Sequence, residues 1–311
     1  MPSFLGIDTS NYTTSVAVYS SEHNQIEQSR RLLPVKDGTL GLRQSDAVFS
    51  HVAQLAEPVE QLLAGAGQIA AVGVSVRPRD AEGSYMPCFL VGELAARSIA
   101  AALRVPLHHF SHQAGHIMAA LYGARQPGLA QSPFIALHIS GGTTDCMLVR
   151  PHAERVLEVE PLSTSLDLKA GQAVDRVGGM LGLGFPAGPE LDALARQSSA
   201  RFAAKPAFKG DDCCLSGVEN LCANLKAKGA PDADVALCCI DYICKAADGM
   251  TARALAKHPG LPVLYCGGVM SNSIIRQRME QKYGGFFAPP QFSSDNACGA
   301  ALLACHKEVP R

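Results

Sequence analysis

The stretch Phe134 to Asp145, FIALHISGGTTD, decides how the rest of this chain is interpreted. An apolar run of strand length ends at Ser140, two glycines follow at once, and a second apolar run, Met147 to Val149, leads away. This order is typical of a strand, a tight turn and a returning strand. Glycine permits positive φ and lets backbone N–H groups approach an anion closely. Taken alone, the stretch fits an ordinary hairpin and a phosphate-binding turn equally well.

A second copy of the pattern near the N-terminus favours the functional interpretation. Residues Phe4 to Tyr19, FLGIDTSNYTTSVAVY, again show an apolar strand, an acid, a hydroxyl-rich turn and a β-branched strand. Each hairpin is followed by alternating strands and helices, which indicates an α/β protein built from two similar halves. We expect an N-terminal lobe over residues 1–130 and a C-terminal lobe over 131–311, with the last helix free to pack back on the first lobe.

Hydrophobic periodicity gives the remaining elements. Beyond the two hairpins, strands are expected at Gln28–Leu33, Ile69–Val76, Val105–His108, Pro262–Cys266 and Phe286–Ala288. Helices are expected at Ser45–Ala64, Phe89–Leu103, from His112, and at Ala170–Leu181, Pro189–Arg196, Ser216–Lys228, Ala233–Lys257, Asn272–Lys282 and Ala297–Lys307.

Composition limits the classes of function. Hydrophobic residues make up 47% of the chain and charged residues 18%, so a sizeable core can form. The net charge of −1 produces no general attraction for nucleic acid or anionic membrane, so any RNA contact needs a local patch or a partner subunit. The N-terminus lacks a signal-peptide pattern and no run of about 18 apolar residues exists. Eleven cysteines in such a chain predict reduced, buried or partly buried thiols in the cytoplasm.

His112 and His116 are the first candidates for chemistry. They are four residues apart, so on a helix both imidazoles lie on one face and can share a metal ion. The alternative is a pair at the surface or the core edge, because this spacing arises by chance in many helices. A zinc peptidase would need glutamate directly after the first histidine. Gln113 stands there, and an amide cannot act as the general base.

Asp295 is a candidate third metal ligand. It lies in SSDNACGAA, just before an alanine-rich helix, where an N-terminal helix cap is the common role. As a ligand it would complete a His-His-Asp set, and such a set suits iron, zinc or manganese.

Three further residues could contact a nucleotide. Asp175 lies within an expected helix and Gly188 in the proline-flanked loop that follows, so an exposed acid and an ordinary turn are the alternative. Asn272 opens a helix after a strand that ends in Gly267-Gly268, and helix N-termini and glycine turns attract phosphate. Neither GxxxxGK[ST] nor GxGxxG is present, so Walker and Rossmann sites are not supported.

Together these motifs resemble the TsaD (Gcp) family, the enzymes of tRNA N6-threonylcarbamoyladenosine synthesis that were once described as glycoproteases. The resemblance runs almost from end to end. It covers GIDTS at Gly6, SHQAGH at Ser111, HISGG at His138, GQAVDRVGGMLGLGFPAGP at Gly171, LSGV at Leu215, YCGGVMSN at Tyr265 and DNACGAA at Asp295. It implies the two-lobed fold of actin, sugar kinases and heat-shock chaperone ATPases (ASKHA), with nucleotide in the cleft between the lobes.

The resemblance also implies roles for individual residues. His112, His116 and Asp295 would hold one divalent metal, iron or zinc, while His138, Ile139, Ser140, Gly141 and Gly142 would hold phosphate. Asp175, Gly188 and Asn272 would contact the ribose and base of an adenine nucleotide or acyl-adenylate. The implied reaction transfers threonylcarbamoyl from its adenylate to N6 of adenosine 37 of tRNA.

Several positions depart from the family pattern. The acidic pair expected after the first TS is replaced by Tyr12 and Thr13, so the catalytic residue is not identified. The glutamate of GEAFDK is Gln172, and the cation of SGLKT is replaced by Glu219. A Gly-Pro-Gly loop is replaced by RPRDAEGSYMPC, Arg77 to Cys88. These changes indicate a divergent paralogue.

The sequence therefore predicts a metal-dependent, nucleotide-binding threonylcarbamoyl or carbamoyl transferase. The same fold acting on another acceptor, as an O-carbamoyltransferase, is one alternative. A nucleotide-binding pseudo-enzyme that serves as a scaffold subunit is another, because the acidic pair is missing. Expected partners are an adenine nucleotide, tRNA, and a homologous protein or a second copy of this chain, with no membrane. The metal and the acceptor are not fixed by the sequence.

Overall fold

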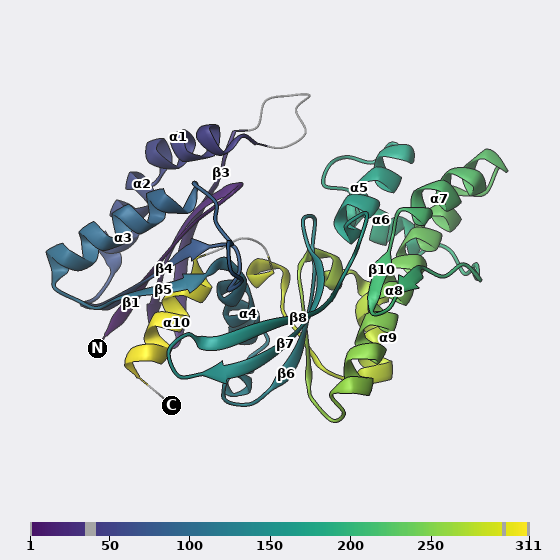
Figure 1. Ribbon diagram of the computed structural model, residues 1–311. Coiled ribbons are helices and arrows are strands. Elements are labelled where there is room, and N and C mark those ends of the chain that lie inside the picture. The colour runs from purple at the N-terminus through teal and green to yellow at the C-terminus, as the bar shows by residue number, and fades with distance from the viewer. Residues whose placement is uncertain (1, 35–41, 294–296, 310–311) are drawn as a thin grey trace. The chain divides into compact units, whose positions relative to one another are not determined.

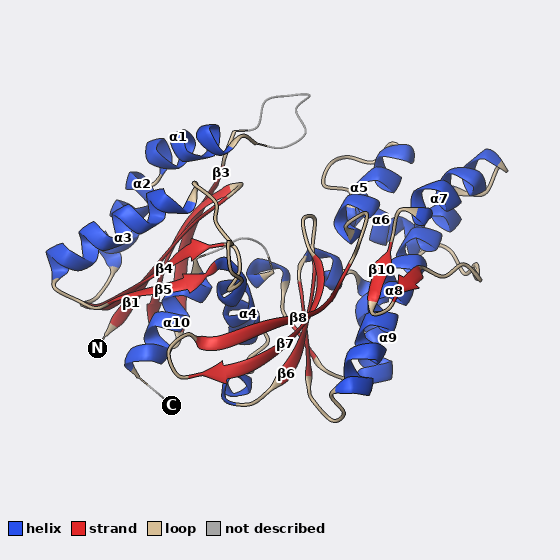
Figure 2. Cartoon of the chain, in the orientation of Figure 1, coloured by secondary structure: helices blue, strands red, loops and turns tan. Residues whose placement is uncertain are grey.

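The computed structural model of the 311-residue chain describes residues 2–34, 42–293 and 297–309. Internal contacts divide the chain into two compact units. Unit 1 comprises the described residues within Met1–Ala130, Pro151–Val159 and Asp295–Arg311, and unit 2 those within Gln131–Arg150 and Glu160–Ser294. Unit 1 contains a five-stranded mixed sheet and unit 2 most of a second one, whose strands β7 and β8 extend into residues 151–159, and helices pack against both sheets (Figure 2), as expected of an α/β protein.

The sheet of unit 1 is built around the N-terminal hairpin. Its strand order is β3-β2-β1-β4-β5. The strands are β1 (Ser3–Ser10), β2 (Thr13–Ser20), β3 (Gln25–Leu32), β4 (Ile69–Arg77) and β5 (Leu107–Ser111). Strand β1 is buried along its whole length because helices cover both faces of the sheet. Helices α1 (Gln44–Gln54), α2 (Ala56–Gly65) and α3 (Phe89–Leu103) lie on one face, and α4 (His112–Gly123) and α10 (Cys298–Glu308) on the other (Figure 1).

Glycines let α10 pack unusually close to the sheet and to α4. A Cβ added at Gly6 of β1 would lie 2.3 Å from the carbonyl oxygen of Ala297, and one at Gly73 of β4 would lie 2.1 Å from that of Ala300. A Cβ added at Gly299 would lie 1.8 Å from the carbonyl oxygen of Gly115 in α4. Since real contacts of this kind are longer than 3.0 Å, only glycine fits at these crossings.

One prediction for unit 1 was wrong. The expected single helix Ser45–Ala64 is two helices that meet at Leu55. Pro58 is the physical reason: it has no N–H to donate to the preceding turn, whereas proline is well tolerated in the first turn of a new helix. The periodicity of apolar residues continues across the break, which is why the pattern alone suggested one helix.

The sheet of unit 2 contains the stretch FIALHISGGTTD. Its order is β12-β11-β6-β7-β8, formed by β6 (Phe134–Ile139), β7 (Thr144–His152), β8 (Val156–Thr164), β11 (Val263–Cys266) and β12 (Phe286–Phe287). Strands β6 and β7 form the predicted antiparallel hairpin, with Ile139 opposite Thr144. Strand β8 was not predicted. It is an edge strand that contains Pro161, and proline in a sheet is tolerated at such an edge.

The helices of unit 2 pack around the long helix α8 (Asp232–Lys257) and the sheet. They are α5 (Ala170–Met180), α6 (Gly188–Ala195), α7 (Gly217–Ala227) and α9 (Ser273–Tyr283), each within two residues of its expected bounds. A small antiparallel pair, β9 (Ala207–Lys209) and β10 (Asp212–Cys214), was not predicted.

All eleven cysteines are free, and all except Cys214 are buried, which confirms the prediction of buried thiols. Burial raises the pKa of Cys146 to about 12, so this thiol stays protonated at neutral pH. Within the described part of the chain, no helix combines the length and the apolar character that crossing a bilayer requires.

Candidate functional site

The histidine pair of unit 1 lies at the start of α4. Ser111 caps this helix, because its Oγ accepts a hydrogen bond of 3.2 Å from the N–H of Ala114. One helical turn separates His112 from His116, and their Nε2 atoms are 2.9 Å apart. The two rings meet edge to face with centroids 4.3 Å apart. The predicted convergence of both imidazoles is therefore present in the structure.

Asp8 orients the first histidine of the pair. Its side chain, 1% exposed at the end of β1, places Oδ2 2.7 Å from Nδ1 of His112. Because the carboxylate of Asp8 accepts a hydrogen bond from Nδ1–H of His112, Nε2 of the neutral ring keeps its lone pair and faces His116. The other carboxylate oxygen accepts from the N–H of Ser10 at 3.0 Å. The sequence showed an acid in GIDTS, but nothing local connects it with a histidine 104 residues away.

The geometry of the pair fits a shared metal ion. Two imidazole nitrogens that each lie about 2.0–2.1 Å from one ion are about 2.8–3.0 Å apart when they subtend about 90° at the metal. The observed separation of 2.9 Å agrees with this value. Within the described ranges, no group of three or more His, Cys, Asp or Glu side chains is arranged to hold a metal. Asp295, the predicted third ligand, lies outside the described residues.

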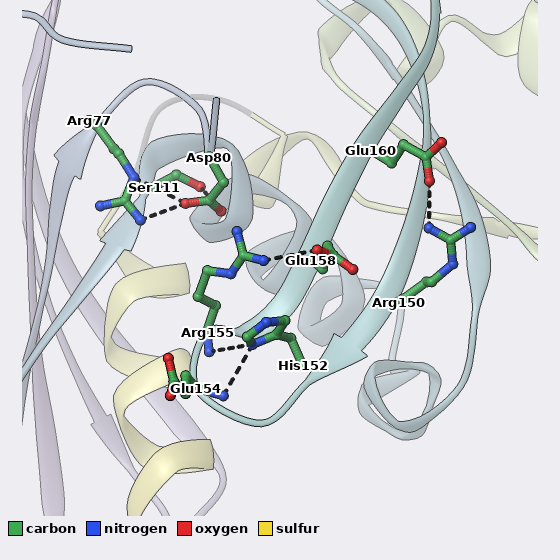
Figure 3. Close-up of polar contacts among 9 residues, drawn as sticks. All are labelled: Arg77, Asp80, Ser111, Arg150, His152, Glu154, Arg155, Glu158 and Glu160. Carbon is green, nitrogen blue, oxygen red and sulfur yellow. Dashed lines mark hydrogen bonds and ion pairs between the residues drawn. The ribbon is translucent and has the colours of Figure 1, made fainter. Parts of the chain in front are cut away.

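The loop that departs from the family pattern is tied to the start of α4 (Figure 3). Asp80 accepts hydrogen bonds of 2.7 and 3.1 Å from the guanidinium of Arg77 through Oδ1, and one of 2.9 Å from Ser111 through Oδ2. The N–H of Gln113 also donates to the carbonyl of Pro78 at 3.0 Å. With 4% of its side chain exposed, Asp80 is a buried, fully paired carboxylate that fixes where α4 begins.

The turn of the N-terminal hairpin carries no carboxylate at the two positions where the family has acids. Tyr12 is 42% exposed, and its carbonyl accepts from the N–H of Leu33 at 2.9 Å. Asn11 accepts a hydrogen bond of 2.6 Å from the side chain of Gln44. Thr13 is buried. The turn is held from outside by neighbouring segments, and Asp8 is the buried acid that this hairpin retains.

His51 supports the same turn, a role that no local sequence pattern indicated. The side chain is fully buried, with Nε2 3.0 Å from the carbonyl oxygen of Ser10 and Nδ1 2.8 Å from the hydroxyl of Thr14. A carbonyl can only accept, so Nε2 carries the proton in the neutral ring. Burial lowers the pKa of His51, although its hydrogen bond to Ser10 acts in the opposite direction.

In unit 2, the turn Ser140–Gly142 has the properties of an anion site. The N–H of Ser140 donates to the carbonyl of Thr143 at 2.8 Å, which closes the turn. Neither Gly141 nor Gly142 donates its N–H to any described residue, and a Cβ added at either would meet nothing within 4 Å. Adjacent exposed N–H groups at a glycine turn can bind phosphate oxygens.

Two other predicted segments close around this turn. At the start of α5, the N–H of Gly171 donates to the carbonyl of Ser140 at 3.1 Å, and an added Cβ there would lie 2.5 Å from Cα of Gly141. Gly267, at φ 94°, packs against the end of β6: an added Cβ would lie 2.2 Å from the carbonyl oxygen of Ile139 and 2.8 Å from the ring of His138. The structure thus brings SGG, GQAVD and YCGG together.

The remaining nucleotide candidates have local partners. Asp175 accepts from the N–H of Ala187 at 3.0 Å and so holds the loop GLGFPAGP. Gly188 begins α6, and a Cβ added there would meet nothing within 4 Å, so its contact with a base stays a prediction. Oδ1 of Asn272 accepts from the N–H groups of Ile274 and Ile275, both at 3.1 Å, so it caps α9. The side-chain amide N–H₂ remains as its group for a ligand.

A lysine that sequence reasoning missed lies directly before α5. The ammonium of Lys169 donates to the carbonyl of Ser165 at 2.7 Å and to the hydroxyl of Thr164 at 3.2 Å. That hydroxyl donates to Asp145 at 2.7 Å. The hydrogen bonds that join Asp145, Thr164 and Lys169 therefore link the end of the glycine hairpin to the segment that enters α5. Asp145 is the last residue of the quoted stretch, and nothing local indicates its lysine partner.

Comparison with solved structures defines the class of fold. Component A of the (R)-2-hydroxyglutaryl-CoA dehydratase of Acidaminococcus fermentans superposes with a TM-score of 0.57 at 16% identity, over 99% of both chains. The activator of the Clostridium difficile 2-hydroxyisocaproyl-CoA dehydratase, with bound ADPNP, gives 0.54 at 15%, over 99% of this chain and 98% of that one. HypF of T. kodakarensis gives 0.60 at 13%, over 97% of this chain and 47% of that one. The fold is of the actin-like, sugar-kinase and chaperone-ATPase class.

The sequence itself places the chain within that class. Residues 40–302 match the family model TsaD, tRNA N6-adenosine threonylcarbamoyltransferase. The chain therefore belongs to the TsaD family, as its motifs indicated, and its departures at the first turn are consistent with a divergent member.

Proposed function

We propose that this protein is a metal-dependent, nucleotide-binding transferase that moves a threonylcarbamoyl or carbamoyl group from an acyl-adenylate to an acceptor. The family supplies the reaction class and, as the acceptor, an adenosine of tRNA. The observation that carries the nucleotide part is the turn Ser140–Gly142. Two N–H groups without partners among the described residues stand there in open surroundings.

The turn would hold the phosphate of the adenylate. The N–H groups of Gly141 and Gly142 can each donate to a phosphate oxygen, and α5 begins beside the turn, so its N-terminal dipole favours the negative charge. Gly171 lets α5 approach this closely. In a transfer from an adenylate, the phosphate is the leaving group, so fixed donors stabilise the charge that develops on it.

The metal would be held by Nε2 of His112 and Nε2 of His116, and when bound it would polarise an oxygen of the substrate as a Lewis acid. Asp8 contributes by fixing the tautomer and orientation of His112. Asp80 contributes by holding Ser111, the cap of the helix that carries both histidines. These contacts hold the two Nε2 atoms directed toward each other, so the nitrogens that would bind the metal are already in place.

One observation favours a second candidate, a nucleotide-binding subunit without catalysis. No carboxylate occupies position 12 or 13, so the first turn offers no general base to accept a proton from an attacking amine. Such a subunit would act with a homologous protein or a second copy of this chain. The histidine pair favours the transferase. A scaffold has no need of two Nε2 atoms that face each other, nor of the buried carboxylate of Asp8 that orients His112.

Metal analysis tests the first part of the proposal. Purified protein is expected to contain close to one iron or zinc ion per chain by plasma mass spectrometry. The double variant H112A/H116A should lose the metal, whereas Gln113→Ala, between the two histidines on the same helix, should keep it. Equal metal content in all three proteins contradicts the site.

A reconstituted reaction separates the two functions. The protein is incubated with threonine, bicarbonate, ATP, an adenylate-forming partner enzyme and tRNA, and nucleosides are analysed by mass spectrometry. Formation of threonylcarbamoyladenosine that depends on this protein supports the transferase. Absence of product, with AMP or ADP binding intact by calorimetry, supports the scaffold or a different acceptor. Absence of nucleotide binding contradicts both.

A further inference from the structure

A basic stripe runs between α6 and α7 in unit 2. Residues 196–210 contain four cations and no acid. From Arg201 onward the exposure alternates with a period of two. The side chains of Arg201, Ala203, Lys205, Ala207 and Lys209 are exposed, and the residues between them are half-buried or buried. This alternation is that of an extended segment with one face toward solvent, and the segment ends in strand β9. The three cations therefore share one face.

The inner face of the segment is fixed to α8. The ammonium of Lys245 donates to the carbonyl oxygens of Phe202 and Ala204 at 2.6 and 3.0 Å. The guanidinium of Arg253 lies 3.8 Å from the ring centroid of Phe208, and a Cβ added at Gly249 would be 2.5 Å from that ring. These contacts hold the backbone near Arg201 and the side chain of Phe208 beside Lys209, so the segment that carries the outward side chains is fixed near both ends.

The outward cations have no partners in the part of the chain that the structure describes. None of Arg201, Lys205 and Lys209 forms an ion pair there, and none of their charged groups is hydrogen bonded. The two nearest acids in sequence are engaged elsewhere. Asp211 pairs with Lys257, and Asp212, opposite Lys209 across the hairpin, accepts from the N–H of Thr164 at 2.8 Å. The three charged groups of the stripe therefore form no direct ion pair with a described residue.

The spacing suits a polynucleotide. In an extended chain with a rise of about 3.3 Å per residue, cations four residues apart are about 13 Å apart, and the stripe spans about 26 Å. A stacked strand advances about 3.4 Å per phosphate, so the stripe covers about eight nucleotides, within the range of known single-strand sites. Alanines between the cations leave room for a backbone to lie along the strand.

We propose that the stripe Arg201–Lys205–Lys209 binds the phosphodiester backbone of an RNA strand. This inference rests on the proposed function, because it assigns a surface to the polynucleotide acceptor. A membrane surface is less well matched, since no large apolar side chain is exposed on the stripe to enter the lipid. The contact is one of charge and carries no base specificity.

Binding of fluorescein-labelled oligouridine of about twelve nucleotides, followed by anisotropy from about 50 to about 200 mM salt, tests the proposal. The variant R201Q/K205Q/K209Q should bind between about tenfold and about a hundredfold more weakly at low salt. Its plot of log affinity against log salt should be shallower by about 2, which is about 0.7 for each of three lost contacts. The control removes three exposed cations elsewhere that also lack partners among the described residues: R104Q/R125Q/K228Q.

The control should change neither the slope nor the affinity by more than about twofold, because its cations lie off the stripe. Equal losses in both variants mean that net charge alone acts, and this overturns the proposal. So does oligouridine binding that the stripe variant leaves intact, or a stripe that binds phosphatidylserine vesicles in preference to RNA. AMP titration of the same proteins reports separately on the turn Ser140–Gly142. If AMP binds and the stripe variant binds RNA normally, the surface assignment fails while the proposed function stands.

Discussion

Replacing Gly171 by alanine tests whether α5 positions the phosphate turn. An added Cβ would lie 2.5 Å from Cα of Gly141, 2.6 Å from its nitrogen and 2.7 Å from the carbonyl oxygen of Ser140. All three obstacles are backbone atoms of the turn, so no side chain can move aside. Ordinary carbon contacts begin at about 3.5 Å, and the turn must therefore shift by about 1 Å.

The size of the effect follows from two opposing terms. Overpacking against fixed atoms costs about 1–3 kcal/mol, and the three contacts at Gly171 place this variant near the upper end. Alanine in a helix regains up to about 1 kcal/mol through propensity. The net loss is about 2 kcal/mol. Gly179 of the same helix is the matched control, because a Cβ there meets nothing within 4 Å and the propensity gain stands alone.

The stabilities of the two variants should therefore change in opposite directions relative to the wild type. Gly179→Ala is expected to be more stable than the wild type by about 0.5–1 kcal/mol and Gly171→Ala less stable by about 2 kcal/mol. For a domain of this size, 1 kcal/mol corresponds to about 2–4 °C, so their melting temperatures should be about 5–12 °C apart. AMP affinity should fall about tenfold or more in Gly171→Ala, since 1.4 kcal/mol of weakened hydrogen bonding is tenfold.

Scanning calorimetry and isothermal titration with AMP measure both quantities. Equal melting temperatures for Gly171→Ala and wild type would show that the turn accommodates a methyl group and is not held by α5. Unchanged AMP affinity in a destabilised Gly171→Ala would show that the turn does not bind the phosphate. Either result refutes the reasoning.

Three further predictions concern stability. Gly299→Ala should destabilise unit 1 by about 3 kcal/mol, because its Cβ would meet the carbonyl oxygen of Gly115 at 1.8 Å. Urea unfolding measures this loss, and a variant as stable as the wild type would contradict the close packing of α10 against α4. Although burial acts to raise the pKa of Asp167, hydrogen bonds from Ser216 and neighbouring N–H groups lower it to about 2. The stability that the wild type gains over Asp167→Asn should therefore shrink as pH falls from about 4 toward 2. A stability difference that stays constant over this range would count against the role of these hydrogen bonds. Burial lowers the pKa of His51, so as pH falls below about 6.5 the histidine is protonated in the unfolded chain before it is protonated in the folded one. This residue therefore lowers the stability by at most about 1.4 kcal/mol per pH unit. His51→Gln should flatten the plot of stability against pH between about pH 7 and 5, and an unchanged plot would exclude a contribution from His51.

The sequence predicted those parts of the molecule that depend on near neighbours. The two hairpins, the glycine turn after Ile139 and most helix ends follow from periodicity and from turn chemistry within a few residues. The convergence of His112 and His116 is of the same kind, because the helical repeat alone places residues four apart on one face. Local errors arose where one residue overrode the pattern. Pro58 divided the first helix, and Pro161, a residue that argues against a strand in a sequence pattern, lies within the edge strand β8.

Only the tertiary structure decided which distant groups act on these local features. Asp8 lies 104 residues before His112, yet its carboxylate sets the tautomer of that ring. Gly171 packs against the glycine turn and Gly267 against the end of β6 just before it, because close backbone packing, which no local pattern shows, requires residues without a Cβ. The basic stripe likewise needed the fold: four cations in fifteen residues are unremarkable until α8 holds the segment extended and turns three of them outward. Periodicity is a property of the chain, whereas the partners of a buried charge or a glycine are chosen by packing.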